Sequence, residues 1–399
     1  MSTNTIIDFE RLHYGGAAHK GINPPISDTS TFWFDSAEEM AKTFEGEAQH
    51  FLYGRHSTPI HAYLGEALAT LEGTEAAHLT ASGMGAISST VLQLCQAGDE
   101  IISSRTVYGG TYAFFKCFLP RFSIHTHFVD ITRPEEIAKV MNAKTKLMYC
   151  ESVSNPLMEV ANIPVLAELA KKNRVKLVVD NTFSPLSITP AEHGADLVIH
   201  SLTKYINGAS DGLGGVICGA EEFMEALRDV NGGAAMLLGP TMDNQRAASI
   251  LKNTKTLPVR MQQHSRNAHY LATQLEKEGI QVMYPGLQSH PSYVLYSALG
   301  NPEFGYGGMF TMDAGTKAKA FALLKNLQQE RLGYLAVSLG SYGTLFSSPG
   351  TGTSSEIPEE ARLEMGLTDS LIRFSIGLDH RIEDTCEKMK GCMRTVGIL

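Results

Sequence analysis

VKLVVDNTFSPLSITPAEHGADLVIHSLTKYINGASDGLGG, residues 175–215, contains two short apolar runs that both lead into polar groups. The first run ends at Asp180, and the second leads through Ser201 to Lys204. Such runs are typical of strands buried in a parallel sheet, and open α/β sheets place ligands at the carboxyl ends of their strands. The glycine-rich stretch 207–215 suits a loop that passes close to a ligand. The segment therefore predicts an α/β fold with a site at these strand ends.

Lys204 has the surroundings of a lysine that forms a Schiff base. Burial between apolar runs lowers the pKa of an amine and makes it nucleophilic. A pyridine cofactor on such a lysine needs an acid at its ring nitrogen, which Asp180 could supply, and the hydroxyls of Ser201 and Thr203 could bind its phosphate. On spacing alone, a surface lysine in a turn and an aspartate that caps the next element stay open as the alternative.

The alternation of strands and helices continues on both sides of this segment. Apolar runs at 75–83, 99–104, 124–130 and 145–152 read as strands, and helical spacing occurs at 61–73, 85–98, 134–143 and 163–173. This order predicts a mostly parallel sheet that is covered on both faces up to about residue 225. A long helical pattern at 247–279 follows, and strands at 305–314 and 370–378 predict a smaller C-terminal α+β domain.

Three regions follow from this pattern. Residues 1–57 form an expected extended, polar N-terminal arm, because their paired prolines and turn residues show no helical period. Residues 58–250 form the expected large domain, and residues 251–399 form the expected C-terminal domain.

Composition excludes several classes of function. The 399 residues are 43% hydrophobic and 19% charged, and the formal net charge of −9 disfavours binding to nucleic acid or to an anionic membrane. The chain lacks an apolar run long enough to span a bilayer, and it does not begin like a secretory signal. The six cysteines have no metal-ligand spacing, so we expect no metal site and thiols in a reducing cytoplasm.

A second element strengthens the assignment of Lys204. The sequence TASGMGA, residues 80–86, follows a short apolar stretch and opens a helical run. A helix N-terminus flanked by glycines presents free backbone N–H groups to a phosphate. An isolated SGMG is weak, but SGMG, VVDN and SLTK in this order on one α/β pattern point together to a phosphate-bearing cofactor on Lys204.

Nearly the whole chain resembles the Cys/Met-metabolism family of enzymes that depend on pyridoxal 5′-phosphate (PLP). The matching motifs are FLYGRHSTP (51–59), SGMGA (82–86), VYGGTYAFF (107–115), ESVSNPLMEV (151–160), VVDNTF (178–183), SLTKYING (201–208), AVSLGSYGTL (336–345) and LIRFSIGLD (371–379). The resemblance implies the PLP-dependent transferase fold of type I, an amino-acid substrate, and a homotetramer built from catalytic dimers.

The same resemblance implies roles for individual residues. Lys204 would carry the cofactor and move protons, Asp180 would hold the pyridinium nitrogen, and Tyr108 would stack on the ring and act as the acid for the leaving group. The implied cofactor-binding residues are Tyr53, Arg55, Gly83, Met84, Tyr108, Asn155, Asp180, Ser201, Thr203 and Lys204.

Within this set, four residues are implied to bind the phosphate, namely Gly83, Met84, Ser201 and Thr203. Tyr53 and Arg55 are implied to reach the phosphate of a neighbouring subunit, and Asn155 to contact the ring hydroxyl. Arg373 would pair with the α-carboxylate of the substrate, and Ser338 would lie near the substrate.

Substrate choice is expected to depend on three positions. Members that handle cystathionine look polar where this chain has Leu52, Ala113 and Val337. A site without distal charges cannot offset the desolvation of a zwitterionic tail, so an uncharged thioether is favoured. In this respect the chain resembles the methionine γ-lyase branch of the family. It departs from that branch at Gly110, where a cysteine is common, and in the loop 341–356.

We therefore expect a PLP-dependent carbon–sulfur lyase that performs α,γ-elimination on L-methionine or a related thioether amino acid. Two alternatives remain open at this point. One is a γ-replacement enzyme of the O-acylhomoserine sulfhydrylase or cystathionine γ-synthase type, or a cystathionine γ-lyase. The other is a non-catalytic protein with the same fold, although the full set of Lys204, Asp180, Tyr108 and Arg373 disfavours it.

Overall fold

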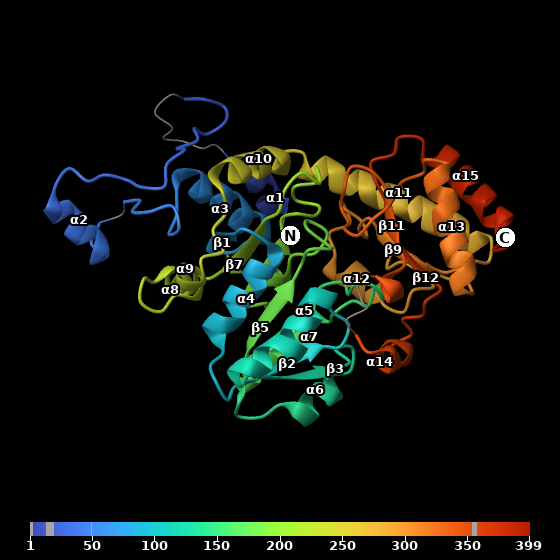
Figure 1. Ribbon diagram of the computed structural model, residues 1–399, viewed down its shortest axis with the longest axis horizontal. Helices are drawn as coiled ribbons and strands as arrows, with labels where there is room; N and C mark the ends of the chain where they lie inside the picture. Colours follow the sequence, from blue (N-terminus) through green and yellow to red (C-terminus); the bar gives the residue numbers. More distant parts are fainter. Residues whose placement is uncertain (1–2, 13–19, 49, 353–356) are drawn as a thin grey trace.

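Two sheets, each with its own helices, make up the body of the protein (Figure 1). The computed structural model describes residues 3–12, 20–48, 50–352 and 357–399. The arm reaches away from one end of the larger unit, and the C-terminus lies at the opposite end of the molecule (Figure 1). Among the described residues, no helix is both long and apolar enough to cross a membrane.

The large sheet is mostly parallel, as expected. Its seven strands follow the order β1-β7-β6-β5-β4-β2-β3, and only β7 runs antiparallel to its neighbours. The strands are β1 (Ala76–Thr80), β2 (Glu100–Ser104), β3 (His125–Val129), β4 (Thr145–Glu151), β5 (Lys176–Asp180), β6 (Leu197–Ser201) and β7 (Gly215–Gly219).

Helices cover both faces of this sheet. Alternate strand residues point to opposite sides, and apolar residues on both sides need to be buried. Leu177 and Val179 pack into a core with α3, α7 and α10, whereas Val178 packs into a second core with α4 and η1. The helices of this unit are α3 (Pro59–Glu72), α4 (Gly83–Leu94), α5 (Gly109–Ala113), η1 (Phe114–Phe118), η2 (Leu119–Phe122), α6 (Pro134–Val140), α7 (Ile163–Asn173), η3 (Pro190–His193), α8 (Glu221–Arg228), α9 (Ala234–Leu238) and α10 (Asn244–Thr254).

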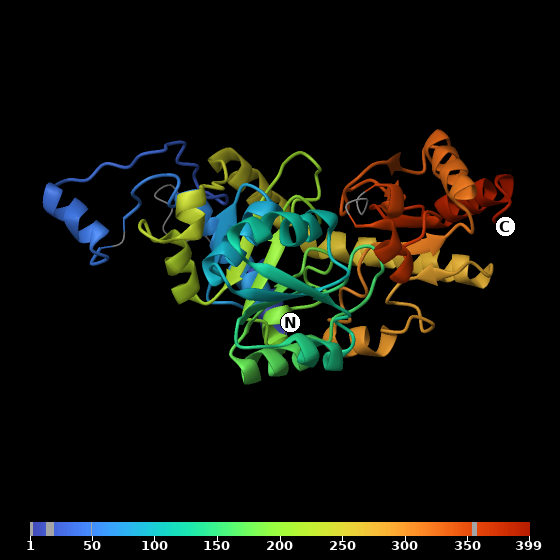
Figure 2. The ribbon, with the colours of Figure 1, turned by 60° about the horizontal axis from the view of Figure 1, so that its bottom comes forward.

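The smaller unit is a largely antiparallel sheet with helices, shown orange to red in Figure 2. Its core joins Phe310 and Phe374 of the sheet to Leu271 of α11, and α11 begins in the core of the large unit at Leu257. Its elements are α11 (Leu257–Lys277), β8 (Val282–Met283), α12 (Tyr293–Leu299), β9 (Met309–Asp313), α13 (Lys317–Gln329), β10 (Tyr334–Leu335), β11 (Leu345–Ser347), η4 (Pro349–Thr351), α14 (Glu359–Glu364), β12 (Leu371–Ser375) and α15 (Ile382–Thr395).

The expectation of a wholly extended, polar arm is wrong in its local structure. Two helices, α1 (Thr3–Glu10) and α2 (Ala37–Phe44), lie within residues 1–57. Helix α1 buries Phe9 in the large core, and the Ser36 side chain caps α2 by accepting from the backbone N–H of Glu39. Trp33 is 83% exposed, so the arm also presents apolar surface.

Two further local expectations need correction. The helical pattern at 247–279 forms two helices, α10 and α11, because Pro258 lies in the first turn of a new helix and cannot continue the hydrogen bonds of the one before. The glycine-rich stretch 207–215 is a loop only up to Gly214, because Gly215 already begins the antiparallel strand β7. The loop 341–356 contains β11 and η4, and its residues 353–356 lie outside the described residues.

Candidate active site

Lys204 lies in the turn that follows β6 at the carboxyl edge of the large sheet. The loop beyond it folds back, and Leu202 N donates to the carbonyl of Gly214 over 2.9 Å. The Lys204 amine donates to Ser338 Oγ over 3.0 Å. Burial, and secondarily the positive charge of Arg373, lower the pKa of Lys204 to about 8. The amine is thus far more readily available as a nucleophile or base than an ordinary lysine.

Asp180 ends the neighbouring strand β5 with a carboxylate that is only 8% exposed. Its Oδ1 accepts from the backbone N–H of Thr182 at 3.0 Å and from the Thr182 hydroxyl at 2.5 Å. Its Oδ2 accepts from the Tyr149 hydroxyl at 3.2 Å. Burial raises the pKa of Asp180, and the bonds from Thr182 and Tyr149 oppose that rise. A cationic ring nitrogen placed here would gain a fixed, desolvated counter-charge.

The N-terminus of α4 faces the same edge of the sheet. Ser82 caps the helix by accepting from Gly85 N at 3.0 Å, which leaves the first backbone N–H groups, at Gly83 and Met84, without a partner inside the helix. A Cβ built on Gly83 would come within 2.8 Å of Ser201 Cβ, so the helix start lies directly against the strand end. This cradle of amides and hydroxyls fits a phosphate group.

Tyr108 and Asn155 are held by one carboxylate, that of Glu151. The backbone N–H of Tyr108 donates to Glu151 Oε1 at 2.6 Å, and that of Asn155 donates to Glu151 Oε2 at 2.9 Å. Tyr108 directly precedes α5 and is 43% exposed, and a Cβ built on Gly110 would lie 2.5 Å from Tyr108 Cε1. The tyrosine ring therefore lies over Gly110.

Arg373 connects the small sheet to this arrangement. Its side chain extends from β12, is 3% exposed, and donates through Nη1 to Asn155 Oδ1 at 2.9 Å and through Nη2 to the carbonyl of Ser338 at 3.1 Å. Both bonds go to neutral acceptors. Among the residues that the structure describes, no carboxylate is paired with this buried guanidinium, which favours binding of an anionic ligand group.

A cavity of about 220 Å³ joins these parts. Its lining contains eight of the residues singled out from the sequence, namely Gly83, Met84, Tyr108, Asn155, Asp180, Ser201, Thr203 and Lys204. Ser338 and Arg373 reach the same group of residues through the hydrogen bonds above. A helix-terminal phosphate cradle, a buried carboxylate and a lysine with a lowered pKa at one cavity are the features that PLP requires, so the residues present fit this cofactor.

The described lining of this cavity does not include five other predicted residues, namely Leu52, Tyr53, Arg55, Ala113 and Val337. Arg55 donates through Nη1 to the carbonyl of Met236 at 2.7 Å, and Tyr53 is 46% exposed beneath the Arg55 guanidinium. Leu52 and Ala113 are half-buried, and Val337 is 67% exposed.

Two of the lining residues that the sequence reasoning did not single out, Glu151 and Thr182, hold predicted site residues through hydrogen bonds. The signal for Glu151 was present, because it ends a buried strand as Asp180 does, and the two residues are in register across β4 and β5. Thr182 gave no comparable signal, because its hydroxyl acts through a bond to Asp180 and through the bond that it accepts from Ser201 N at 2.8 Å.

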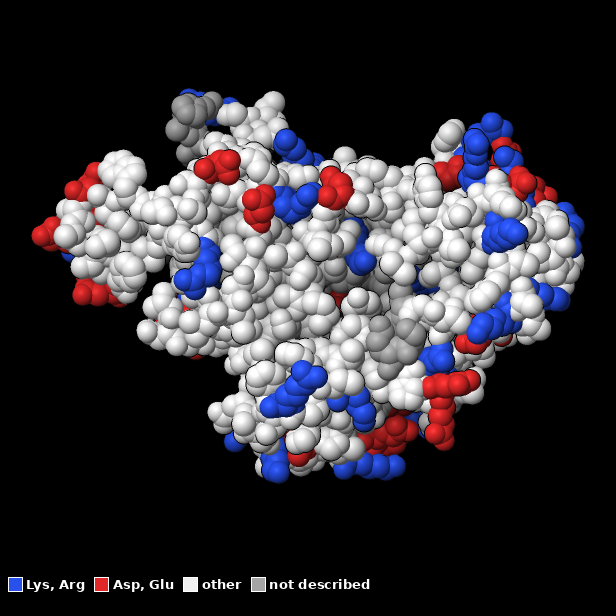
Figure 3. Space-filling model, viewed as in Figure 1, with Lys and Arg blue, Asp and Glu red and all other residues white. Residues whose placement is uncertain are grey.

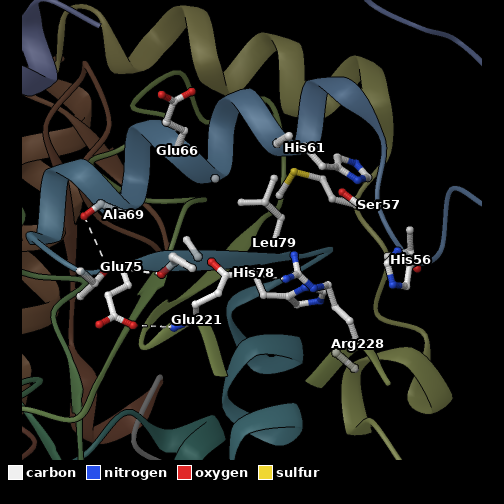
Figure 4. Close-up of a pocket in the computed structure, with 18 of the residues that line it drawn as sticks. His56, Ser57, His61, Glu66, Ala69, Glu75, His78, Leu79, Glu221 and Arg228 are labelled. Atoms are coloured by element: carbon white, nitrogen blue, oxygen red, sulfur yellow. Dashed lines mark hydrogen bonds and ion pairs between the residues drawn. The ribbon is translucent and has the colours of Figure 1, made fainter. Parts of the chain in front are cut away.

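A second cavity, of about 300 Å³, lies between α3 and the edge strand β1 (Figure 4). Figure 4 shows His78 and Arg228 side by side, with His56 and His61 on the same part of the wall. Burial, and secondarily the charge of Arg228, lower the pKa of His78 to about 3. It therefore remains neutral near neutral pH. This cavity lacks the lysine and the helix N-terminus of the first, which makes the Lys204 cavity the candidate active site.

Comparisons with known proteins point to an enzyme that depends on PLP. The family model described as Cys/Met metabolism PLP-dependent enzyme matches residues 10–394. A methionine gamma-lyase from Arabidopsis thaliana is 41% identical over 366 residues, which cover 90% of this chain and 83% of the relative. An L-methionine gamma-lyase from Porphyromonas gingivalis is 37% identical over 390 residues, which cover 95% of each chain.

A solved structure from Campylobacter jejuni, described as an O-acetylhomoserine (thiol)-lyase, is similar to the whole chain. It has a TM-score of 0.90 and 27% identity over 98% of this chain and 99% of that chain. One of its lysines is recorded as N′-pyridoxyl-lysine-5′-monophosphate.

Proposed function

The chain belongs to the Cys/Met metabolism PLP-dependent enzyme family, and from this premise we propose that it is a carbon–sulfur lyase. The proposed reaction is the α,γ-elimination of L-methionine or a related thioether amino acid. With methionine and water, the products are methanethiol, 2-oxobutanoate and ammonia. The similarity to the methionine gamma-lyases of two organisms supports this choice.

The observation that carries the proposal is the distribution of charged and apolar residues around the Lys204 cavity, where few charged side chains meet a largely apolar wall. Among the described residues that line it, only Glu151, Asp180 and Lys204 are charged, and Arg373 adds one cation close by. Asp180 and Lys204 match a cofactor, and Arg373 matches one α-carboxylate. Glu151 already accepts from the N–H groups of Tyr108 and Asn155, so no charged group remains for a second zwitterionic end. The rest of the wall is largely apolar and includes Ile87, Val153, Phe183, Leu213 and Leu339. An uncharged thioether therefore fits this wall better than the distal end of cystathionine.

We assign the cofactor to four groups of residues. The α4 N-terminus with Ser201 and Thr203 would hold its phosphate, and Asp180 its ring nitrogen. Tyr108 would stack on the ring, and Asn155 would contact its hydroxyl. When bound, PLP supplies an electron sink that stabilises negative charge at the substrate α-carbon.

The remaining work falls to side chains of the chain itself. Arg373 binds the substrate α-carboxylate. The hydrogen bond from Lys204 to Ser338 Oγ holds the lysine amine near Arg373, which donates to the carbonyl of the same serine. Lys204 takes the proton from Cα, as its pKa of about 8 allows near neutral pH, and then moves a proton at Cβ. Tyr108 donates a proton to the γ-sulfur as the thiol leaves.

We also propose a homotetramer built from catalytic dimers, in which Tyr53 and Arg55 reach the phosphate of a neighbouring subunit. The exposure of Ile22 (97%) and Trp33 (83%) on the arm supports this, because burying such apolar surface against another chain is favourable.

Figure 3 shows charges of both signs interspersed on the face that it views, with acidic side chains on α2, which fits an amino-acid enzyme rather than a nucleic-acid binder. Six unpaired cysteines fit the cytoplasm, where we place the protein.

A γ-replacement reaction on an O-acylhomoserine is the second candidate. The apolar cavity wall favours it as well, because an acyl ester carries no distal cation. The similarity to the Campylobacter jejuni structure supports it. The two candidates differ in whether an added thiol is incorporated into the product.

The test is 2-oxoacid formation by the purified protein with PLP, comparing L-methionine with L-cystathionine and with O-acetylhomoserine plus a thiol. Oxobutanoate from methionine, with little from cystathionine, is the expected result. Thioether formation from O-acetylhomoserine without methionine cleavage would select the second candidate. Lys204→Ala must abolish both turnover and the visible absorbance of the bound cofactor, whereas the surface variant Lys176→Ala must retain them. Turnover by the Lys204 variant would refute the site.

A further inference from the structure

Glu151 lies where two segments of the candidate site meet. It is the last residue of β4, its side chain is 7% exposed, and it faces the Lys204 cavity. We propose that Glu151 is a positioning residue that fixes Tyr108 relative to Arg373. The inference rests on the proposed function, because it assigns the two positioned groups to the leaving group and to the substrate carboxylate.

Both carboxylate oxygens of Glu151 are used, and each holds a different segment. Oε1 accepts from the backbone N–H of Tyr108 at 2.6 Å, at the start of α5. Oε2 accepts from the backbone N–H of Asn155 at 2.9 Å, in the loop beyond β4. The two segments are therefore tied to one rigid strand end, and neither can shift without breaking a hydrogen bond to the buried carboxyl group of Glu151.

The connection continues across the two units of the fold. The side chain of Asn155 accepts from Arg373 Nη1 at 2.9 Å, and Arg373 also donates to the carbonyl of Ser338 at 3.1 Å. The path from Tyr108 to Arg373 thus passes through Glu151 and Asn155 only. It joins the group proposed to protonate the sulfur to the group proposed to hold the carboxylate, at opposite ends of one substrate.

A carboxylate is the side chain that this task requires. Each of its oxygens accepts hydrogen bonds, whereas a glutamine at the same place would present an NH₂ group to one of the two backbone N–H groups. Burial and the neighbouring Asp180 raise the pKa of Glu151, and the hydrogen bonds from the N–H groups of Tyr108 and Asn155 oppose that rise because they stabilise the ionised form. A group that only filled space would not need a charge that burial and a like neighbour disfavour.

The experiment compares Glu151→Gln, Glu151→Asp and Glu100→Gln in the PLP-loaded protein. Glu100 is a matched control, because it accepts two hydrogen bonds, from His127 and Asn142, at the opposite edge of the same sheet. The measurements are kcat and KM for methionine, together with the visible circular dichroism of the bound cofactor, which reports how the ring is held. We expect Glu151→Gln to lower kcat/KM about 100-fold, the loss that a misplacement of about 1 Å can cause.

The dichroism should change in Glu151→Gln while the absorbance remains, because Lys204 is intact. Glu151→Asp keeps a carboxylate and should recover part of both signals, and Glu100→Gln should match the wild type. Unchanged dichroism and kcat/KM in Glu151→Gln, or an Asp variant no better than the Gln variant, would overturn the inference. If Glu151→Gln fails to fold, the Asp variant decides, since wild-type dichroism and kinetics in it would also overturn the inference. A wild type without visible absorbance or turnover would instead refute the proposed function.

Discussion

The amine of Lys204 lies 3.0 Å from the hydroxyl of Ser338, whose own carbonyl accepts from Arg373 at 3.1 Å. One serine therefore joins the lysine of the large unit to the arginine of the small sheet. Ser338 has φ of 123°, a conformation that residues with a side chain rarely adopt, and the surrounding bonds hold it there. Lys204 and Arg373 are thus close enough for the charge of one to affect the protonation of the other.

The first prediction concerns the pH at which the apoprotein takes up PLP. Burial and then Arg373 disfavour the charged amine, so the pKa of Lys204 falls from 10.5 to about 8. Only the neutral amine attacks an aldehyde. The rate of recombination with PLP should rise about tenfold per pH unit below pH 8 and level off above it. Stopped-flow absorbance at fixed ionic strength measures this profile.

The variant Arg373→Gln tests the cause of the shift. Loss of the arginine removes a positive charge that opposes protonation of Lys204, so the pKa of the lysine must rise and the midpoint must move to higher pH. A midpoint that stays at the wild-type value would show that burial alone sets the pKa of Lys204.

The sequence predicts the large sheet well because its strands are defined by local composition. The apolar run at 145–152 becomes β4, and the run ending at Asp180 becomes β5. Helix α2 was missed although its signal, Ser36 followed by Glu39, is a recognised helix start. The paired prolines and turn residues elsewhere in the arm obscure that short local signal.

The site is predictable only in part. Strand ends gather Asp180, Ser201 and Lys204 by topology, and each can be found from its position after an apolar run. The contact between Asn155 and Arg373 joins residues 218 positions apart, so it depends on how the two units pack and leaves no local pattern. Glu151 lies between these cases. Its position at the end of an apolar run can be found from the sequence, but its hydrogen bonds to the N–H groups of Tyr108 and Asn155 cannot.

The second prediction concerns the buried pair of Glu72 and His200 behind the sheet. His200 Nε2 lies 2.6 Å from Glu72 Oε1, the side chains are 0% and 1% exposed, and the same oxygen accepts from Asn181 at 3.2 Å. Glu72→Ala should lower the free energy of unfolding by about 3–5 kcal/mol, because it removes the partner of the buried imidazole and one of the two acceptors of the Asn181 amide. Denaturant unfolding of the apoprotein at one protein concentration measures the change.

The control is Lys317→Ala, which breaks an exposed ion pair with Asp369 at 2.9 Å. This change should cost less than about 1 kcal/mol, because solvent screens the pair. Equal losses in Glu72→Ala and Lys317→Ala would contradict the role assigned to burial.

The third prediction concerns substrate choice. The double variant Ala113→Arg with Val337→Glu should raise the ratio of cystathionine to methionine cleavage by about tenfold or more, because each added charge can pair with the distal zwitterion. The measurement is kcat/KM for both substrates in one oxoacid assay. The control Val294→Glu makes the same substitution as Val337→Glu, but on α12 at a site that is 77% exposed, and should leave the ratio unchanged. An unaltered ratio in the double variant would show that these positions do not face the substrate.

The last prediction concerns Gly110, over which the ring of Tyr108 lies. A methyl group added at Gly110 would meet Tyr108 Cε1 at 2.5 Å and Cζ at 3.1 Å, so the ring must rotate away from its place. Gly110→Ala should therefore lower kcat for methionine by about tenfold or more, since a displaced acid transfers its proton less efficiently.

The stability of Gly110→Ala should remain close to that of the wild type, because a flexible ring relieves the contact. A fall in kcat without a fall in the unfolding midpoint is the expected result. Gly391→Ala supplies the matched control, because Gly391 lies in α15 with open space around its Cβ position. There the added methyl group should raise helix stability by up to about 1 kcal/mol and leave kcat unchanged. Wild-type kcat in Gly110→Ala would mean that the position of the Tyr108 ring over Gly110 has no part in catalysis, and that another group protonates the leaving sulfur.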